Sequence, residues 1–415
     1  MEPILFLTHR IPFPPNKGDK IRSFNILKWL SKHYEVHLGC FVDDVDDRKY
    51  VSELGKYCKS YKAVNLNPML SKVKSLKALF FGKPLTLPYY ESEELRRWVE
   101  STIGEHDIEL SLMFSSSMAQ YLESQCYGVN QRVLDMIDVD SDKWKQYSEK
   151  ASFPMSWVYS REFRTLAEYE KKIVSKFDAV ALVSHEEAEL LRSMVGGDLK
   201  RKVHDVCNGV DSEFFDPQNE YEKLGLPKKM VSFTGVMDYW ANVESVVWFC
   251  RYVWPEVVKK HPDACFYIVG TSPSSDVLAL NDGVNVVVTG RVSDVRPYIE
   301  SSSVVVAPLR IARGVQNKVL EALSMEKAVF GTSMAFEGID YTGHELDILI
   351  EDNEANFSEA LISQFDLDKQ NTKASVSKRN RDFVIGNYNW NAKLNALQPL
   401  LQRDIKLGYV GGDAK

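Results

Sequence analysis

The sequence has few features of a secreted protein, of a protein stabilised by metal ions or of a membrane-embedded protein. Its six cysteines are scattered and include no C-x-x-C pair, whereas zinc sites and disulfide frameworks show close spacing. Reduced thiols in a cytoplasmic protein are therefore expected. We expect no signal peptide, because the apolar run 4–7 is short and His9 and Arg10 follow at once. No window approaches the ~18 consecutive apolar residues of a membrane span.

Other absences exclude whole classes of function. The formal net charge of −7 argues against general nucleic-acid binding, which needs a basic surface to displace counterions from phosphates. No G-x-G-x-x-G follows a predicted strand, as a dinucleotide-dependent dehydrogenase would require. The phosphate-binding pattern G-x-x-x-x-G-K-[ST] is also missing.

What is present is a regular alternation of strands and helices. At 415 residues the chain is long enough for two domains of ~200 residues each. Buried-strand patterns in the first half lie at 4–7, 35–42, 110–114, 132–136 and 179–183, and those in the second half lie at 230–235, 265–269, 284–288, 304–307 and 328–331. The alternation predicts an α/β protein with two Rossmann-like, doubly wound domains facing a cleft. A helix is expected from about 243 to 258, and a last helix from roughly 391 to 405. We expect domains at 1–200, completed by a C-terminal helix within 388–415, and at 201–387.

The strongest chemical signal is the segment 308–323. A buried strand leads into a loop that contains Arg313 and Gly314, and the loop opens a helix. Lys318 and Glu321 stand three residues apart and so share one helix face. Cations and free N–H groups at a helix start suit a diphosphate, and a carboxylate one turn deeper suits the hydroxyls of a ribose. The alternative is an exposed Lys–Glu pair on a surface helix.

This segment resembles the nucleotide-sugar loop of the retaining GT-B glycosyltransferases, family 4 in particular. Glu321 matches the family's second glutamate, so the resemblance implies that it holds the ribose. Arg313 stands where the family has its first glutamate, which contacts the donor sugar. The donor contact is therefore expected to differ, or the donor to be more anionic.

Other segments carry the same resemblance. Residues 206–211 are similar to the family's Pro-Asn-Gly-Val-Asp element, with Cys207 in place of proline. Residues 233–242 are similar to its first C-domain loop, where the backbone at Gly235 would approach phosphate. Asn242 stands where many members have a cation, so neutralising the diphosphate would fall to Arg313, Lys318 and Arg291. The resemblance thus implies donor binding by the following residues: Gly235, Asn242, Arg291, Arg313, Gly314, Lys318 and Glu321.

The first half supplies candidates for the acceptor side. His9 and Arg10 end the first strand and are expected to point into the cleft. The loop 12–19 resembles the family's glycine loop, and Arg10, Lys17 and Gly18 are expected to bind acceptor. Asp138 or Asp140, after the strand 132–136, is expected to face the acceptor hydroxyl. The predicted catalytic residues are His9, Asp138 and Lys318.

The pair of aspartates at 138 and 140 has two further interpretations. D-x-D is the metal motif of the other glycosyltransferase fold, but a two-Rossmann protein needs no metal for its diphosphate, so we expect no metal and no cofactor. The second interpretation is that Asp140 or Ser141 caps the helix that follows.

A basic stretch runs from residue 54 to residue 90, with seven lysines and no acidic residue. Within it, apolar and basic residues interleave over 68–83. This part is expected to lie on an anionic membrane surface. The alternative is a solvated helix that covers the first domain.

More narrowly, the segments 8–15 and 134–141 and the loop at 313–318 resemble the sugar transferases of exopolysaccharide clusters associated with PEP-CTERM/exosortase systems. The resemblance implies transfer, with retention of configuration, from a nucleotide-diphosphate sugar, for which UDP- or GDP-sugars are favoured. The acceptor would be a glycan or a lipid-linked glycan, and the enzyme cytoplasmic or peripheral on the inner face of the plasma membrane. Two alternatives stay open, a nucleotide-sugar epimerase of the same fold and a non-catalytic sugar-nucleotide-binding protein.

Overall fold

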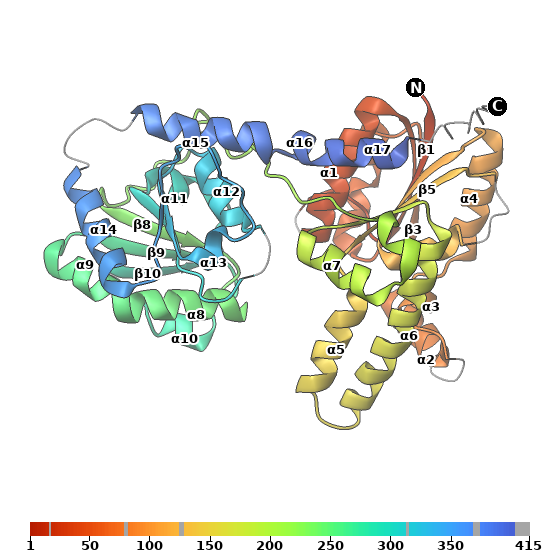
Figure 1. Ribbon diagram of the computed structural model, residues 1–415, viewed down its shortest axis with the longest axis horizontal. Coiled ribbons are helices and arrows are strands. Elements are labelled where there is room, and N and C mark those ends of the chain that lie inside the picture. The colour runs from red at the N-terminus through yellow and green to blue at the C-terminus, as the bar shows by residue number, and fades with distance from the viewer. Residues whose placement is uncertain (16–17, 79–81, 124–127, 313–314, 368–373, 403–415) are drawn as a thin grey trace, which may run out of the picture. The chain divides into compact units, whose positions relative to one another are not determined.

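The chain divides into two compact units. The computed structural model describes residues 1–15, 18–78, 82–123, 128–312, 315–367 and 374–402 (Figure 1). Unit 1 comprises Met1–Cys207 and the segment that begins at Leu394, and unit 2 comprises Asn208–Lys393. The chain thus passes from unit 1 to unit 2 after Cys207 and returns after Lys393.

Unit 1 is built on a parallel sheet. Its described strands are β1 (Pro3–Thr8), β2 (Glu35–Val42), β3 (Ser60–Asn65), β4 (Leu110–Phe114), β5 (Gln131–Ile137), β6 (Ala179–Leu182) and β7 (Val203–Asp205). They lie in the order β3-β2-β1-β4-β5-β6-β7, and every neighbouring pair is parallel. The order reverses at β1, so the crevice outside the carboxyl ends of β1 and β4 is the place where such sheets bind ligands.

The helices of unit 1 connect these strands and hold the return of the chain. They are α1 (Gly18–His33), α2 (Pro68–Ala78), α3 (Thr86–Tyr89), α4 (Glu93–Glu105), α5 (Asp140–Lys150), α6 (Met155–Lys176), α7 (His185–Met194) and α17 (Gln398–Leu401), with α16 (Trp390–Leu394) at the return from unit 2. The indole of Trp29 in α1 donates to Asn395 at 3.1 Å, and Gln131 at the start of β5 donates to the carbonyl of Leu400 at 2.8 Å. The returning segment is therefore part of unit 1.

Two buried ion pairs fix the start of α1. Arg22 and Asp135 of β5 are both almost completely buried, and the guanidinium Nη2 lies 2.7 Å from the carboxylate Oδ2. Lys20, also buried, lies 3.0 Å from Asp47. A buried charge without its partner is strongly unfavourable. Any shift of α1 that separated these pairs would therefore be costly, so the pairs fix α1 against the sheet.

Unit 2 repeats the architecture. Its described strands are β8 (Met230–Thr234), β9 (Cys265–Val269), β10 (Val286–Gly290), β11 (Val304–Ala307), β12 (Val329–Gly331) and β13 (Ile348–Ile350). They form a parallel sheet in the order β10-β9-β8-β11-β12-β13. The order reverses at β8, which places the expected binding crevice at the carboxyl ends of β8 and β11.

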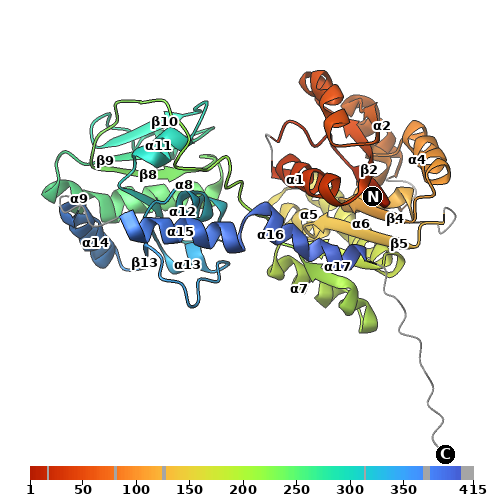
Figure 2. The same cartoon turned by 90° about the horizontal axis from the view of Figure 1, so that it is seen from above.

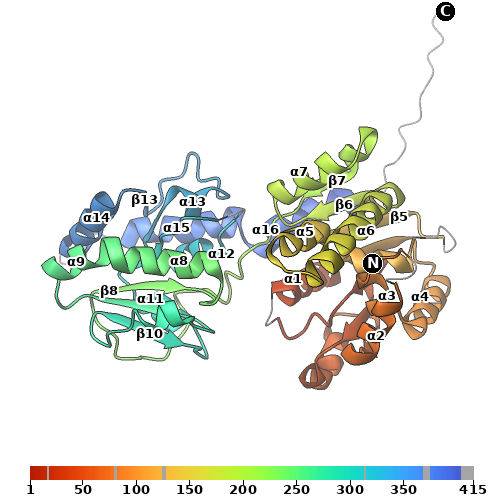
Figure 3. The same cartoon turned by 90° about the horizontal axis from the view of Figure 1, so that it is seen from below.

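The helices of unit 2 cover both faces of its sheet. They are α8 (Trp240–Trp248), α9 (Trp254–Lys260), α10 (Ser275–Leu278), α11 (Arg296–Ser301), α12 (Asn317–Ser324), α13 (Ser333–Phe336), α14 (Glu354–Leu367) and α15 (Ala374–Asn387). Seen from above and below, α12 and α15 lie side by side on one face, and α8 lies on the other (Figures 2 and 3). Both units are thus doubly wound, and the predicted fold class is confirmed.

Several elements differ from the sequence prediction. The strands β3 and β13 were not predicted, because β3 is a partly exposed edge strand and β13 spans only Ile348–Ile350. The helix expected at 243–258 is broken by a π-helical segment at Phe249–Val253. The last helix, expected at 391–405, is divided by a 3₁₀ turn at Asn395–Leu397 within its described part.

Candidate functional site

The crevice of unit 2 gathers a lysine, an asparagine and an aromatic ring. The Lys318 ammonium, at the start of α12, donates to the side-chain oxygen of Asn242 at 2.6 Å. The same ammonium lies over the Phe233 ring, 4.1 Å from its centroid. Asn242 is itself buried and donates through its amide nitrogen to the carbonyl of Val236 at 2.9 Å. The lysine is therefore held in one place by groups from β8 and α8.

Gly235 directly follows β8, at the point where these groups meet. A Cβ on this residue would lie 2.7 Å from the amide nitrogen of Asn242 and 3.5 Å from the ammonium of Lys318. The loop after β9 is equally close, since a Cβ on Gly270 would lie 1.6 Å from the carbonyl oxygen of Gly235. Glycine is required at position 270, where a Cβ would meet backbone, whereas a Cβ at position 235 would fit only if the Asn242 side chain moved. In this structure the space beside Gly235 is occupied by the Asn242 side chain.

Burial controls the charges of Lys318 and Glu321. Burial lowers the pKa of Lys318 to about 8, and the negative charge of Glu321 opposes that shift. Burial raises the pKa of Glu321 to about 7, and the positive charge of Lys318 opposes it. Both groups therefore titrate near neutral pH and sense each other's charge. Neither side chain is turned to bulk solvent, so the alternative of an exposed surface pair is wrong.

The other residues discussed as candidates for donor binding are Arg313, Gly314 and Arg291. Arg313 and Gly314 lie outside the described residues. Gly290 ends β10 with a φ of +66°, and Arg291 follows it as an exposed residue. Because β9 lies between β10 and β8, Arg291 belongs to a loop at the edge of the sheet.

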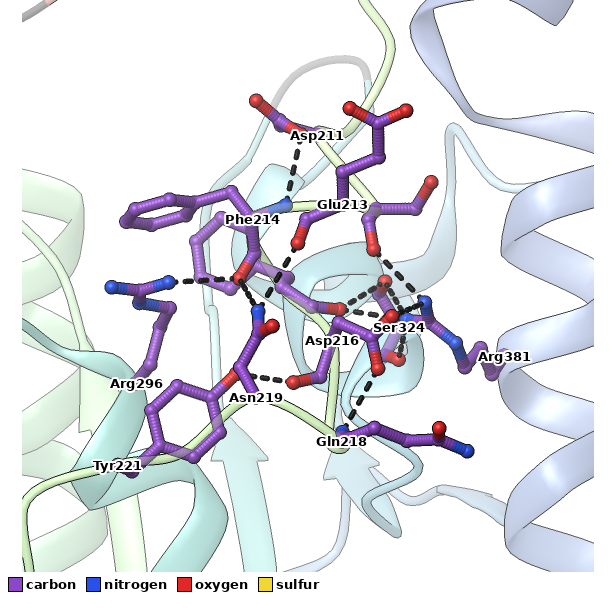
Figure 4. Close-up of polar contacts among 12 residues, drawn as sticks. Asp211, Glu213, Phe214, Asp216, Gln218, Asn219, Tyr221, Arg296, Ser324 and Arg381 are labelled. Atoms are coloured by element: carbon purple, nitrogen blue, oxygen red, sulfur yellow. Dashed lines mark hydrogen bonds and ion pairs between the residues drawn. The ribbon is translucent and has the colours of Figure 1, made fainter.

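The chain enters unit 2 through residues 212–216, here called the entry segment. Two arginines bind it from opposite sides, Arg296 and Arg381 (Figure 4). On one side the Arg296 guanidinium lies 3.6 Å from the centroid of the Phe214 ring and donates to the Phe214 carbonyl at 3.1 Å. The Nη2 atom of Arg296 also donates a hydrogen bond to Asp294 at 2.6 Å, which fixes the guanidinium. Residues 294–296 follow directly on the loop that contains Gly290 and Arg291.

On the other side, Arg381 of α15 reaches the same segment. It donates to the carbonyls of Phe215 and Ser324, each at 2.8 Å, and pairs with Asp216 at 2.6 Å. Ser324 is the last residue of α12 and donates its hydroxyl to the Phe215 carbonyl at 2.8 Å. The entry segment thereby fixes the helix that carries Lys318 and Glu321. Sequence reasoning missed both arginines, because nothing near them in the chain indicates their partners.

Unit 1 brings a second cluster to its crevice. The Nε2 atom of His9 lies 3.2 Å from Asp19, and the His9 ring stacks on Phe114 with 5.7 Å between centroids. The other ring nitrogen, Nδ1, is buried and has no hydrogen-bond partner among the described residues. Although burial opposes ionisation, the hydrogen bonds and charges of His9 and Arg10 hold the pKa of Asp19 well below its usual range. The His9 ring is thus held through Nε2 and by the stacking on Phe114, while Nδ1 makes no hydrogen bond within the described residues.

Arg10 is already matched by carboxylates. Its Nη1 donates to Asp19 at 2.9 Å, and its Nε lies 2.8 Å from Asp43 at the end of β2. Two carboxylates therefore neutralise the guanidinium expected to bind acceptor. Gly18 is the first residue of α1, and a Cβ there would meet nothing within 4 Å, while Lys17 lies outside the described residues.

Asp138 and Asp140 both follow β5, in distinct surroundings. Asp138 comes after Ile137, whose φ is +70°, and is partly exposed. Asp140 begins α5, accepts from the Ser116 hydroxyl at 3.3 Å and senses the charge of His9. Burial raises the pKa of Asp140, Lys143 opposes this shift and the charge of Asp138 adds to it. Asp140 is therefore linked to the histidine.

The predicted cap of α5 is wrong. The residue before the helix is Val139, and no side chain caps it. The Ser141 amide donates instead to Glu170 of α6 at 3.1 Å, and the Ser141 hydroxyl donates to the same carboxyl group. Burial raises the pKa of Glu170 to about 8, although the Ser141 hydrogen bonds oppose this. Among the described residues there is no group of three or more His, Cys, Asp or Glu side chains placed to hold a metal ion.

Comparisons with known proteins bear on the fold and on unit 2. The structure is similar to a glycosyltransferase from Rickettsia africae, with a TM-score of 0.60 and 14% identity over 96% of this chain and 97% of that one. It is also similar to the HepE protein of Anabaena in complex with UDP, with a TM-score of 0.60 and 11% identity over 97% and 99% of the two chains. A sucrose-phosphate synthase from Thermosynechococcus elongatus gives a TM-score of 0.63 and 18% identity over 96% and 98%. The fold is therefore the two-domain GT-B fold.

The sequence comparisons add a family match for unit 2. Residues 228–366 match the family described as "Glycosyl transferases group 1". A Klebsiella pneumoniae protein, described as an uncharacterized 44.6 kDa protein in the cps region, is 24% identical in an alignment of 381 positions that covers 88% of this chain and 91% of that protein. The family match and the fold together support a glycosyltransferase. None of the helices in the described part of the chain is long and apolar enough to cross a membrane.

Proposed function

We propose that this protein transfers a sugar, with retention of configuration, from a nucleotide-diphosphate sugar to a glycan or lipid-linked acceptor, without a metal or cofactor of its own. The observation that carries the proposal is the arrangement of Lys318, Asn242 and Glu321 at the crevice of unit 2. Lys318 and Glu321 carry opposite charges that interact with each other, and burial removes both from water. This loss of hydration raises the free energy of the site when no ligand is bound. A ligand that presents negative and hydrogen-donating groups relieves that cost.

A nucleotide-diphosphate sugar has those groups. Its pyrophosphate would take the Lys318 ammonium and displace the bond to Asn242, and the ribose hydroxyls would donate to Glu321. Arg291, Arg313, Gly235 and Gly314 are assigned to the same ligand by their resemblance to family positions. Stabilising the charge on the departing diphosphate is the main electrostatic task of the transfer.

On the acceptor side we assign the hydroxyl to the cluster in unit 1. The unpartnered Nδ1 of His9 and the carboxyl groups of Asp138 and Asp140 are the groups suited to orient a hydroxyl. Because Arg10 is paired with Asp19 and Asp43, we assign it to holding the His9 loop.

Relatives suggest the setting of the reaction. The related Klebsiella protein lies in a cps region, which hints at capsule polysaccharide. HepE was crystallised with UDP-glucose, which favours a UDP-sugar as the donor here. We therefore propose a role in cell-surface polysaccharide synthesis on the inner face of the plasma membrane, with residues 68–83 facing anionic lipid.

A donor screen tests the proposal. UDP-, GDP- and ADP-sugars are added to the full chain in a thermal-shift assay, since a ligand raises stability in proportion to its affinity. Glu321→Ala should abolish the shift that the best donor gives, and Glu256→Ala should keep it. The control removes an exposed carboxylate that also pairs with a lysine three residues on, Lys259.

Product analysis then separates the reactions. A transferase forms a glycoside only when acceptor is present, and its anomeric configuration follows from NMR of the product. An altered nucleotide sugar formed without acceptor would indicate an epimerase. A donor that binds but is neither transferred nor hydrolysed would indicate a binding protein, and both results would contradict the proposal.

A further inference from the structure

The helices α5 and α6 form a projection that the transfer reaction does not explain. They make a hairpin of residues 140–176 that extends away from the sheet of unit 1 (Figure 1). The rings of Trp144, Tyr147 and Tyr159 join the two helices, with centroids 5.4 to 6.0 Å apart. At the base of the hairpin, Glu170 of α6 receives the bonds from Ser141 of α5. The projection is therefore internally packed and fixed to unit 1.

The turn of this hairpin exposes large apolar side chains. Phe153 is 82% exposed, Trp157 55%, Tyr147 49% and Met155 44%. Single exposed apolar residues are common, but four within eleven positions of the chain concentrate exposed apolar surface near the turn, as interaction sites do. The patch lies on a convex turn, so it suits a broad surface better than a small ligand.

A second apolar surface stands beside the hairpin. Met69, Leu70 and Val73 of α2 are 80%, 62% and 55% exposed. The segment after α2 is tied to α6, because Glu162 accepts from the Leu85 amide at 2.8 Å and Arg161 donates to the Lys83 carbonyl at 3.1 Å. Seen from below, α2 and α3 lie next to the hairpin (Figure 3).

The charges around both surfaces are mainly basic. Lys145 on α5 and Lys74 on α2 are exposed. From Lys143 to Arg161 the sequence has four basic residues and the single acidic residue Glu149. Aromatic and apolar side chains with lysines around them match the boundary between lipid headgroups and acyl chains, where the lysines meet anionic phosphates. Tyrosine and tryptophan favour this boundary because one end of each ring is polar.

From these observations we infer that the turn of the α5–α6 hairpin, together with α2, docks on the surface of a bilayer that contains anionic lipid. The hairpin begins at Asp140, directly after the carboxyl end of β5, and α2 follows the carboxyl end of β3. Both surfaces therefore leave the same edge of the sheet at which His9 and Asp140 lie. The acceptor cluster would then face the membrane. The inference extends the contact proposed for residues 68–83 and does not depend on the transfer reaction.

Vesicle flotation of the full chain tests the inference. The probes are vesicles of phosphatidylcholine alone and of phosphatidylcholine with about 30% phosphatidylglycerol. The wild type should float with the anionic vesicles. Phe153→Ser/Trp157→Ser should lower the lipid partition coefficient by about tenfold or more, because two large apolar groups no longer leave water. Val284→Ser, which removes a 67% exposed side chain of unit 2, should leave flotation unchanged.

A second variant tests the contribution of the lysines to membrane binding. Lys74→Gln/Lys145→Gln should reduce flotation with anionic vesicles and leave any binding to neutral vesicles unchanged. Cooperative thermal unfolding of all variants near the wild-type temperature shows that they are folded. This control does not need a donor, so a failure of the donor proposal would alter neither it nor flotation. Wild-type protein that does not float, or a Phe153/Trp157 variant that floats as well as the wild type, overturns the inference. Sedimentation without lipid showing self-association that these substitutions abolish would assign the surface to a second copy instead.

Discussion

Replacing Glu321 by glutamine should change how the stability of the free protein depends on pH. Burial raises the pKa of this carboxyl from 4.5 to about 7. The folded state therefore binds more protons than the unfolded state between these pH values, and the free energy of unfolding falls as pH rises through that range. The stability that the group contributes is complete below its unfolded pKa and lost above about 7. A pKa change of this size corresponds to about 3 kcal/mol.

The substitution keeps the shape of the side chain and removes the titration. Wild type and Glu321→Gln are unfolded with urea at several values between about pH 5 and about pH 8, with indole fluorescence as the signal. The wild type should lose about 3 kcal/mol more than the variant across this range. Glu256→Gln, an exposed carboxylate of unit 2, should follow the wild type. Parallel stability curves for wild type and Glu321→Gln would refute the assignment of a buried, coupled carboxyl group.

Three further substitutions test single contacts. Arg381→Ala should destabilise unit 2 by about 2–4 kcal/mol in urea unfolding, because three carbonyls and Asp216 lose a charged donor, while Arg379→Ala on the same helix should cost little. Gly235→Ala should raise the donor Kd by about tenfold in calorimetry, since its methyl group, 3.5 Å from the Lys318 ammonium, takes space assigned to the diphosphate, and an unchanged Kd would refute a close approach of the donor to Gly235. Asp140→Asn should lower kcat for transfer by about a hundredfold without changing donor Kd, whereas its neighbour Asp142→Asn should retain activity.

The sequence predicted the elements whose signals are local. Buried runs such as those of β1 and β11 alternate with helices, and this alternation alone defines two doubly wound sheets. The strands β3 and β13 were missed because an edge strand or a very short strand lacks a continuous apolar run. The helix at 243–258 and the last helix were predicted as continuous, since a π-helical segment or a 3₁₀ turn leaves the apolar periodicity nearly intact.

In the candidate site, too, residues with a local sequence signal were predicted, and contacts between distant parts of the chain were not. Lys318 and Glu321 could be found from their spacing on one helix and from the strand before it. The contacts of Asn242 with Lys318 and of Arg381 with the entry segment join residues 76 and more than 160 positions apart, so no local pattern could indicate them. Asp138 and Asp140 were similar candidates in the sequence. They differ in the structure because Asp140 accepts from the Ser116 hydroxyl and senses the charge of His9, whereas Asp138 is partly exposed after the positive φ of Ile137.

The balance of charge in the unit 2 crevice determines whether protons move when a donor binds. At pH near 8 about half of the Lys318 side chains lack a proton, and at pH near 7 about half of the Glu321 carboxyl groups carry one. A sugar nucleotide diphosphate has no group that titrates in this range. It favours the charged form of both residues through its phosphates and its ribose hydroxyls.

Titration calorimetry of the best donor in buffers of different ionisation enthalpy measures those protons directly. The account predicts net uptake of up to about half a proton near pH 8, net release of a similar amount near pH 7, loss of the uptake in Lys318→Met and loss of the release in Glu321→Gln. Donor binding with the same proton count in wild type and both variants would contradict the claim that these two residues hold the nucleotide sugar.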